Sequence, residues 1–84
     1  MNSSMTVKDA CVARINEICK ERHITYNDLA VRSGVTPSTV YSMADSERRN
    51  LSVSTLKKLC DGLEISLKDF FDSSIFTELE QEIR

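Results

Sequence analysis

Apolar residues recur along most of this chain at steps of three and four positions, which is the spacing of one face of an α-helix. The first stripe joins Cys11, Ile15 and Ile18 and predicts a helix over about residues 7–22. Later stripes predict four more helices. The second contains Leu29 and Ala30, and the third contains Val40 and Met43. The fourth contains Leu56, Leu59, Cys60 and Leu63, and the fifth contains Leu67, Phe70 and Phe71. Alternating apolar and polar positions are scarce, so we predict an all-α fold.

Residues with short polar side chains mark the predicted helix starts. Three of them stand three residues before an aspartate, which is a capping-box spacing: Thr6, Thr25 and Ser66. Ser52 fits the cap of the fourth helix, and Thr36 that of the third, with Pro37 at a first position that needs no amide donor. Gly34 ends the second helix, over residues 26–33, because glycine readily adopts left-handed backbone.

The stripes point to one shared core, for which we expect Ile15, Ile18, Leu29, Ala30, Val35, Val40, Met43, Leu56, Leu59 and Leu63. One more helix can form over residues 74–84, where Ile75, Leu79 and Ile83 recur every four residues beside Phe76. This stripe has two interpretations. It packs on the chain's own core, or it pairs with a second copy in a homodimer.

Composition places the chain among ordinary globular domains, with 40% hydrophobic and 29% charged residues. We expect a cytoplasmic protein, because its start lacks a basic and apolar signal segment and its apolar runs are far shorter than the roughly 20 residues of a membrane span. Three cysteines without a C-x-x-C spacing predict buried thiols rather than a disulfide framework.

Charge is unevenly distributed. Residues 7–63 hold nine Lys and Arg against seven Asp and Glu, a local balance of +2, whereas residues 64–84 hold two against six, a balance of −4. The net charge of −2 therefore leaves room for a basic face on the first three quarters of the chain.

The segment ITYNDLAVRSGVTPSTVYSM resembles the helix-turn-helix of the phage-repressor family (XRE, Cro and lambda repressor). The matching positions are Ile24, Thr25, Leu29, Ala30, Gly34, Val35, Thr36, Val40 and Met43, and NLSVSTLKKLCDGLEISLKDFF is similar to the family's next two helices. The resemblance implies a five-helix lambda-repressor-like bundle over residues 1–72, followed by an acidic amphipathic segment over residues 73–84 that is a candidate dimerisation helix. It also implies a small transcriptional regulator, a repressor, that binds double-stranded DNA as a homodimer.

The same resemblance implies two sets of DNA contacts. Residues of the third helix would read bases: Pro37, Ser38, Tyr41 and Ser42. Residues of the helix starts and of the following loop would hold phosphates: Thr25, Tyr26, Arg48, Arg49, Asn50 and Ser52. Arg32, Lys57 and Lys58 are weaker phosphate candidates. None of the four base-reading residues is Arg, Asn or Gln, so we expect modest discrimination that depends partly on DNA shape.

Two positions depart from the family pattern. Members usually have Gln at the start of the second helix, where it grips a phosphate and braces the third helix, and this chain has Tyr26, whose phenol can donate to phosphate. Members often have Gly between the fourth and fifth helices, and this chain has Glu64. A left-handed Glu would cost about 1 kcal/mol, so we expect that turn to be built differently.

Other functions find less support. Cys19 and His23 are four residues apart, but zinc needs three or four ligands and no second pair stands at metal spacing. The lone histidine has no recognisable orienting partner and the glycines form no phosphate loop, so we expect neither an enzyme, nor a cofactor, nor a small-molecule ligand. The alternative function is a protein-interaction module on the same fold, such as an antirepressor or an antitoxin-type partner binder.

Overall fold

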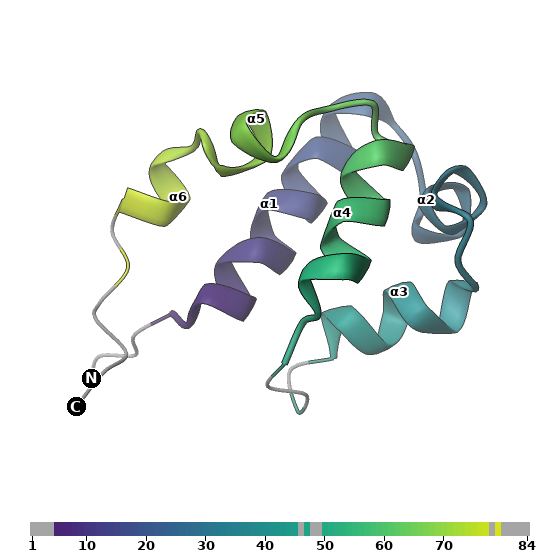
Figure 1. Cartoon of the computed structure of the whole chain (residues 1–84), viewed down its shortest axis with the longest axis horizontal. Helices are drawn as coiled ribbons and strands as arrows, with labels where there is room; N and C mark the ends of the chain where they lie inside the picture. Colours follow the sequence, from purple (N-terminus) through teal and green to yellow (C-terminus); the bar gives the residue numbers. More distant parts are fainter. Residues whose placement is uncertain (1–4, 46, 48–49, 78, 80–84) are drawn as a thin grey trace.

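The computed structural model describes residues 5–45, 47, 50–77 and 79, and this part of the chain is helical without any strand. Its helices are α1 (Val7–Arg22), α2 (Tyr26–Ser33), α3 (Pro37–Ala44), α4 (Val53–Gly62), α5 (Leu67–Phe71) and α6 (Ser74–Thr77) (Figure 1). The five helices predicted from the apolar stripes are all present, and α1 and α2 begin and end where the sequence predicted.

Local capping explains where these helices begin. The Thr6 hydroxyl accepts a hydrogen bond from the Asp9 amide at 3.1 Å, and the Asp9 carboxylate accepts one from the Thr6 amide, so the predicted capping box closes. Thr25 and Asp28 form the same arrangement at the start of α2. Gly34 ends α2 with a φ of 70°, the left-handed conformation that the sequence predicted for it.

The helices share one hydrophobic core. Helix α2 packs against both α3 and α4, while α1 covers the other side of the core. The buried apolar residues are Ala10, Cys11, Ile15, Ile18, Cys19, Leu29, Ala30, Val40, Met43, Leu56, Leu59, Cys60, Leu63 and Phe70. Val35 was expected in this set, but it is only half-buried because it lies in the turn before α3 and touches the core from its edge.

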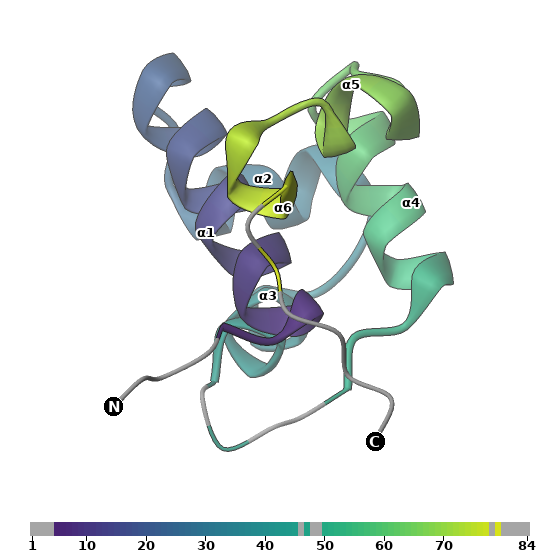
Figure 2. The same cartoon turned by 90° about the vertical axis from the view of Figure 1, so that its left-hand side faces the viewer.

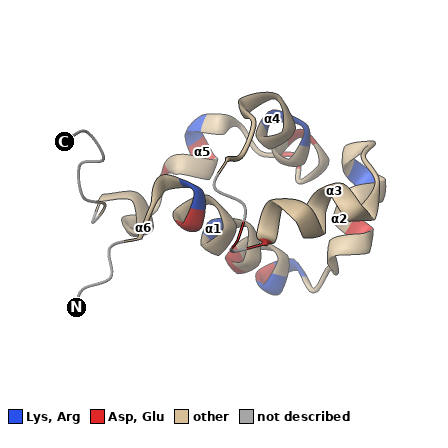
Figure 3. Ribbon diagram, turned by 90° about the horizontal axis from the view of Figure 1, so that it is seen from below, with Lys and Arg blue, Asp and Glu red and all other residues tan. Residues whose placement is uncertain are grey.

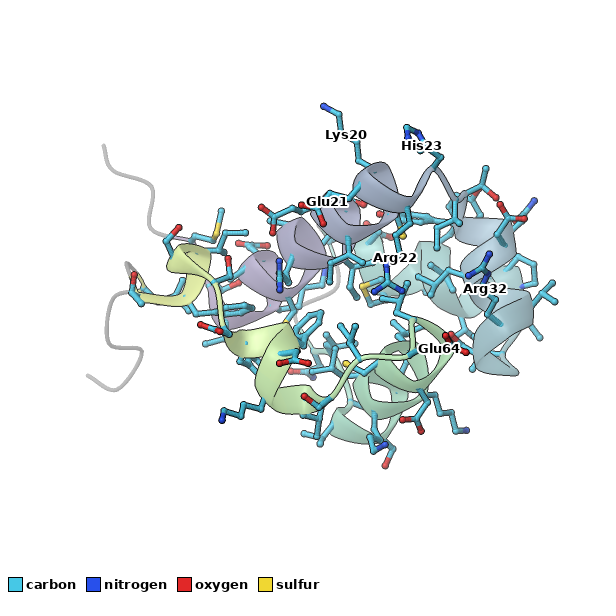
Figure 4. All side chains as sticks on the ribbon, turned by 90° about the horizontal axis from the view of Figure 1, so that it is seen from above. Lys20, Glu21, Arg22, His23, Arg32 and Glu64 are labelled. Atoms are coloured by element: carbon cyan, nitrogen blue, oxygen red, sulfur yellow. The ribbon has the colours of Figure 1, made fainter. Side chains whose placement is uncertain are left out.

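Two arginines of α1 fasten the second half of the chain. Arg14 donates from Nε to the carbonyl oxygen of Phe70 at 2.8 Å and from Nη2 to that of Asp69 at 2.9 Å. Arg22 donates to the carbonyl oxygen of Leu63, and Figure 4 shows it pointing from the end of α1 toward the turn that carries Glu64. Because helix ends leave carbonyl oxygens without partners, the bonds to Phe70 and Leu63 satisfy groups at the ends of α5 and α4, whereas the Asp69 oxygen also accepts from the Asp72 amide at 3.2 Å.

The turn between α4 and α5 corrects one expectation. Glu64 has a φ of 60°, so this turn does use a left-handed residue, and the prediction that it would be built differently is wrong. The Ile65 amide bonds to the Cys60 carbonyl at 3.0 Å and the Glu64 amide to that of Asp61 at 3.0 Å, which closes the helix end in the way that a glycine normally does. Burial of Leu63 and the bond from Arg22 offset the backbone cost, which is about 1 kcal/mol.

Helix α6 is shorter than the segment that the sequence predicted. It ends at Thr77, Leu79 lies outside any helix, and Ile83 lies outside the described residues. Phe76 packs on Phe70 and Phe71, with ring centroids 5.9 and 4.9 Å apart, respectively, and α6 lies against α1 (Figure 2). The first part of the segment over residues 74–84 thus packs on the chain's own core.

Candidate nucleic-acid interface

A tight turn fixes α3 against α2. Left-handed Gly34 lets the Val35 amide reach back to the Ala30 carbonyl at 3.1 Å, and the chain then enters α3 directly. Thr36 caps α3 by accepting from the Thr39 amide at 3.3 Å, and Pro37 occupies its first position. The two helices and their three-residue connection form the predicted helix-turn-helix.

Helix α3 has one buried face and one open face. Val40 and Met43 are buried, whereas Pro37, Ser38 and Tyr41 are exposed. Ser42, the fourth predicted base-reading residue, is half-buried at the border between the faces. The helix carries no Lys, Arg, Asp or Glu, so its ribbon is tan, without blue or red, in the view from below (Figure 3). Any base contact it makes is therefore made by hydroxyls and by apolar surface.

Tyr26, the first residue of α2, touches both neighbouring helices. Its ring meets the ring of Tyr41 edge to face, with centroids 5.3 Å apart and planes at 68°. Its hydroxyl donates a hydrogen bond to Oδ1 of Asn16 on α1. Burial raises the pKa of the Tyr26 phenol above its ordinary value, so the group is a neutral phenol at physiological pH. Asn16 gave no signal in the sequence, because it is one polar residue on an exposed helix face.

The helix starts differ in charge. At α2 the Asp28 carboxylate accepts the amide of Thr25, and this hydrogen bond is the main reason that the pKa of Asp28 lies below its ordinary value. Helices α3 and α4 have no acidic residue in their first turns and are capped by the hydroxyls of Thr36 and Ser52 alone. Their positive ends are thus not neutralised locally, which favours a nearby anion.

A shallow cavity of about 140 Å³ lies between the half-buried border of α3, at Thr39 and Ser42, and the start of α4. It is lined by Thr39, Ser42, Met43, Asn50, Leu51, Ser52 and Thr55. The structure therefore brings together three residues that the sequence singled out, Ser42, Asn50 and Ser52. Most of the polar groups here are hydroxyls, which can donate to a phosphate or accept from a base.

The Arg and Lys residues that the sequence predicted as phosphate contacts come from separate parts of the chain. Arg48 and Arg49 lie outside the described residues, so their assignment stays a prediction. Arg32 is exposed at the end of α2, where Figure 4 places it on the side of the molecule seen from above. Lys57 forms an ion pair with Asp61 one turn further along α4, and Lys58 is exposed.

The thiols and the histidine form no reactive cluster. Cys11, Cys19 and Cys60 are free and buried, and burial is the main cause that raises the pKa of each thiol, that of Cys60 to about 11. His23 is exposed and ends α1 in a left-handed conformation, with a φ of 57°. Among the described residues, no group of three or more potential ligands could hold a metal ion.

The profile of the Cro/C1-type HTH DNA-binding domain matches residues 14–73, which is most of the chain. The chain belongs to this Cro/C1-type helix-turn-helix family. It is therefore a DNA-binding regulator of transcription and not an enzyme. In the part of the chain that the structure describes, no helix combines the length and the hydrophobicity that crossing a membrane requires. No curated relative matches the sequence.

Solved structures agree with this family and with the predicted lambda-repressor-like fold. The crystal structure of the prophage Lp1 protein 11 is 28% identical, covers 88% of this chain and 97% of that chain, and has a TM-score of 0.77. The wild-type restriction-modification controller protein C.Esp1396I is 27% identical over 84% of this chain and 91% of that chain, with a TM-score of 0.72. A nucleoprotein complex of C.Esp1396I is 25% identical over 90% of this chain and 96% of that one, with a TM-score of 0.75.

Proposed function

We propose that this protein is a sequence-specific regulator, a repressor of its own or a neighbouring promoter, which reads double-stranded DNA with the open face of α3. One observation carries the proposal. An uncharged, exposed helix face lies beside the start of α4, and neither α3 nor α4 has a carboxylate in its first turn. Such a surface can approach the DNA backbone without repelling its phosphates and still present hydroxyls and an aromatic ring to the groove.

Base reading would fall to the four residues of α3. Pro37 and Tyr41 offer apolar surface for thymine methyl groups, and the hydroxyls of Ser38 and Ser42 can donate to or accept from several bases. None of them can form the bidentate contacts of Arg, Asn or Gln. Discrimination would therefore be modest and would include a contribution from DNA shape.

Phosphate binding would fall to the helix starts. Asn50 and Ser52 line the cavity beside α3, and together with the first amides of α4 they would form the stronger site, because no acidic residue occurs in that turn. Thr25 and the start of α2 form a weaker site, since the Asp28 carboxylate lies at the same place. The sequence adds Arg48 and Arg49 as cations of the connecting loop.

A homodimer would supply the second reading helix that an operator with two half-sites needs. The acidic segment over residues 73–84 is the candidate for its seam, through Ile75, Leu79 and Ile83. Sedimentation of the full chain at high concentration tests this part of the proposal. A monomer there would remove the dimer from the proposal and leave DNA binding to stand on its own.

Selection of binding sites from a random pool of double-stranded DNA tests the main proposal. We expect an enriched site that binds more tightly than random DNA at every salt concentration. If the enriched site lies within the promoter of the same operon, a reporter gene placed behind that promoter tests repression. Silencing of the reporter by the protein would support a repressor. If no DNA binds even at low salt, the proposal fails and a protein-interaction role replaces it.

A further inference from the structure

Tyr26 occupies the position at which the sequence suggested a phosphate contact, but its contacts point to another role. A phenol has one proton to donate, and in this structure that proton is directed to Oδ1 of Asn16. The remaining lone pairs of the hydroxyl can only accept, so they would repel a phosphate oxygen rather than bind it. As burial also raises the pKa of Tyr26, the group keeps its proton at physiological pH.

The ring of Tyr26 supports the recognition helix instead. It is half-buried and packs against the core, and it meets the ring of Tyr41 edge to face at a centroid distance of 5.3 Å. This is a preferred geometry for aromatic pairs. Tyr41 has the largest exposed side chain of α3, with 55% of its surface accessible, so the place of its ring decides which base pairs it can reach.

Asn16 completes the arrangement from outside the helix-turn-helix. It lies on α1, ten residues before Tyr26, and its amide oxygen fixes the outer end of the Tyr26 side chain. Without that acceptor the Tyr26 ring is held at its inner end alone. Three helices therefore meet in one series of contacts, from Asn16 to Tyr26 to Tyr41.

We propose that Asn16 and Tyr26 are positioning residues that set the orientation of the Tyr41 ring and thereby the base preference of α3. This inference rests on the proposed function of α3 in reading DNA. The two residues need not touch DNA themselves. Their effect would appear in the ratio between the preferred site and its single-base variants, rather than in the affinity for all DNA.

The test compares Tyr26→Phe, Asn16→Ala and the double variant, each measured on the selected site, on its single-base variants and on random DNA. Tyr26→Phe keeps the ring and removes only the hydroxyl. Each single variant should lower the discrimination ratio by about twofold to tenfold, the range of one neutral hydrogen bond. The double variant should lose no more than either single one, because both remove the same contact.

Two controls separate positioning from phosphate binding and from folding. Asn16→Asp keeps an acceptor for the phenol, so it should retain the discrimination ratio even though its added charge weakens binding to all DNA. In a Tyr41→Ala background, Tyr26→Phe and Asn16→Ala should have no further effect on discrimination. If Tyr26→Phe instead weakens binding equally on every sequence while Asn16→Ala does nothing, Tyr26 is a phosphate contact and the proposal is overturned.

A second readout needs no DNA. The chain has two tyrosines and no tryptophan, so the tyrosine band of near-ultraviolet circular dichroism reports on Tyr26 and Tyr41. Asn16→Ala should reduce this signal while far-ultraviolet helicity stays unchanged, and Asn16→Asp should preserve it. An unchanged tyrosine signal in Asn16→Ala would refute the positioning role even if the protein binds DNA. If Asn16→Ala reduces the tyrosine signal but the protein binds no DNA, the orienting contact is supported. The proposed function, and with it the effect on base preference, would then be wrong.

Discussion

The ammonium group of Lys8 donates a hydrogen bond of 2.5 Å to the carbonyl oxygen of Asp45, the residue that ends the recognition helix. Lys8 lies on the first turn of α1, and only 7% of its surface is exposed. A cation at a helix end meets the negative pole of the helix and satisfies a carbonyl oxygen that has no partner within it. This one contact holds the end of α3 against a helix outside the helix-turn-helix.

Replacing Lys8 by Met should destabilise the protein by about 1.5–3 kcal/mol, the range for a hydrogen bond to a charged group. Methionine keeps most of the aliphatic stem, so the loss reports on the ammonium group and not on packing. Lys68→Met, at an exposed site on α5, is the matched control and should change the unfolding free energy by less than about 0.5 kcal/mol. Urea denaturation measures both, and equal stabilities for the two variants would contradict the assigned contact.

Sequence alone predicted the helices well because their boundaries depend on neighbours. Thr6 with Asp9 caps the start of α1, and Gly34 ends α2 directly after Ser33. In both cases the residues that set the boundary are close together in the sequence. The contacts of Lys8 with Asp45 and of Tyr26 with Asn16 join residues that are 37 and ten positions apart, respectively. Lys8 and Asn16 each look like an ordinary polar residue of a helix surface, so no local pattern could distinguish them.

Glu64 shows the opposite case, in which a local rule gave the wrong answer. The backbone preference of a non-glycine residue argued against a left-handed turn. The structure has one because the bond from Arg22 to Leu63 and the burial of Leu63 fix the same place from outside. Likewise, the sequence assigned Ser42, Asn50 and Ser52 to DNA separately, but their shared cavity depends on the angle between α3 and α4.

Gly62 should be intolerant of a side chain, although it ends a helix in which alanine is normally preferred. A Cβ atom there would lie 2.2 Å from the Ser33 hydroxyl oxygen and 2.9 Å from the Ser33 amide nitrogen. The hydroxyl can rotate away, but the backbone amide cannot, so α2 and α4 would have to separate. We expect Gly62→Ala to cost about 1–3 kcal/mol, as overpacked cores do.

Gly34→Ala is the comparison for that variant. Gly34 has a φ of 70° and open space around its Cβ position, so alanine there meets only the backbone penalty of about 1 kcal/mol. Thermal unfolding of both variants should place Gly62→Ala below Gly34→Ala. A Gly62→Ala protein that is as stable as the parent would show that α2 and α4 are not in close contact at this point.

The buried thiol of Cys60 predicts a loss of stability at alkaline pH. Burial, aided by the nearby Asp61 carboxylate, raises its pKa from 9.0 to about 11 in the folded protein. The unfolded chain therefore ionises first, and its free energy falls relative to that of the folded state between pH 9 and pH 11. The contribution of Cys60 is intact below pH 9 and declines through that interval.

Cys60→Ala should make the decline of unfolding free energy between pH 9 and pH 11 shallower than in the parent protein. The slope is the informative quantity, since the substitution also leaves a small cavity that lowers stability at every pH. Chemical denaturation at a series of alkaline pH values gives this slope. Identical slopes in the two proteins would mean that the thiol ionises as readily in the folded state as in the unfolded chain.

The last prediction separates the residues that read bases from those that grip the backbone. Phosphates are alike at every base pair, so Arg49→Ala should weaken binding to all sequences by similar factors and lower the salt slope by about 1. Lys68→Ala removes the same charge from α5, which lies on the opposite side of the molecule from α3, and should leave the salt slope unchanged (Figure 1).

Ser38→Gln should have the complementary effect, because Ser38 lies on the open face of α3 and carries no charge. Glutamine can bond adenine through both of its polar atoms, so the selected site should gain an adenine at one position and keep its salt slope. Affinity against salt for the selected site, its single-base variants and random DNA measures both classes together. Should Ser38→Gln leave every base preference unchanged while Arg49→Ala still lowers the salt slope, the protein would bind the DNA backbone, and base reading would have to come from Pro37, Tyr41, Ser42 or DNA shape.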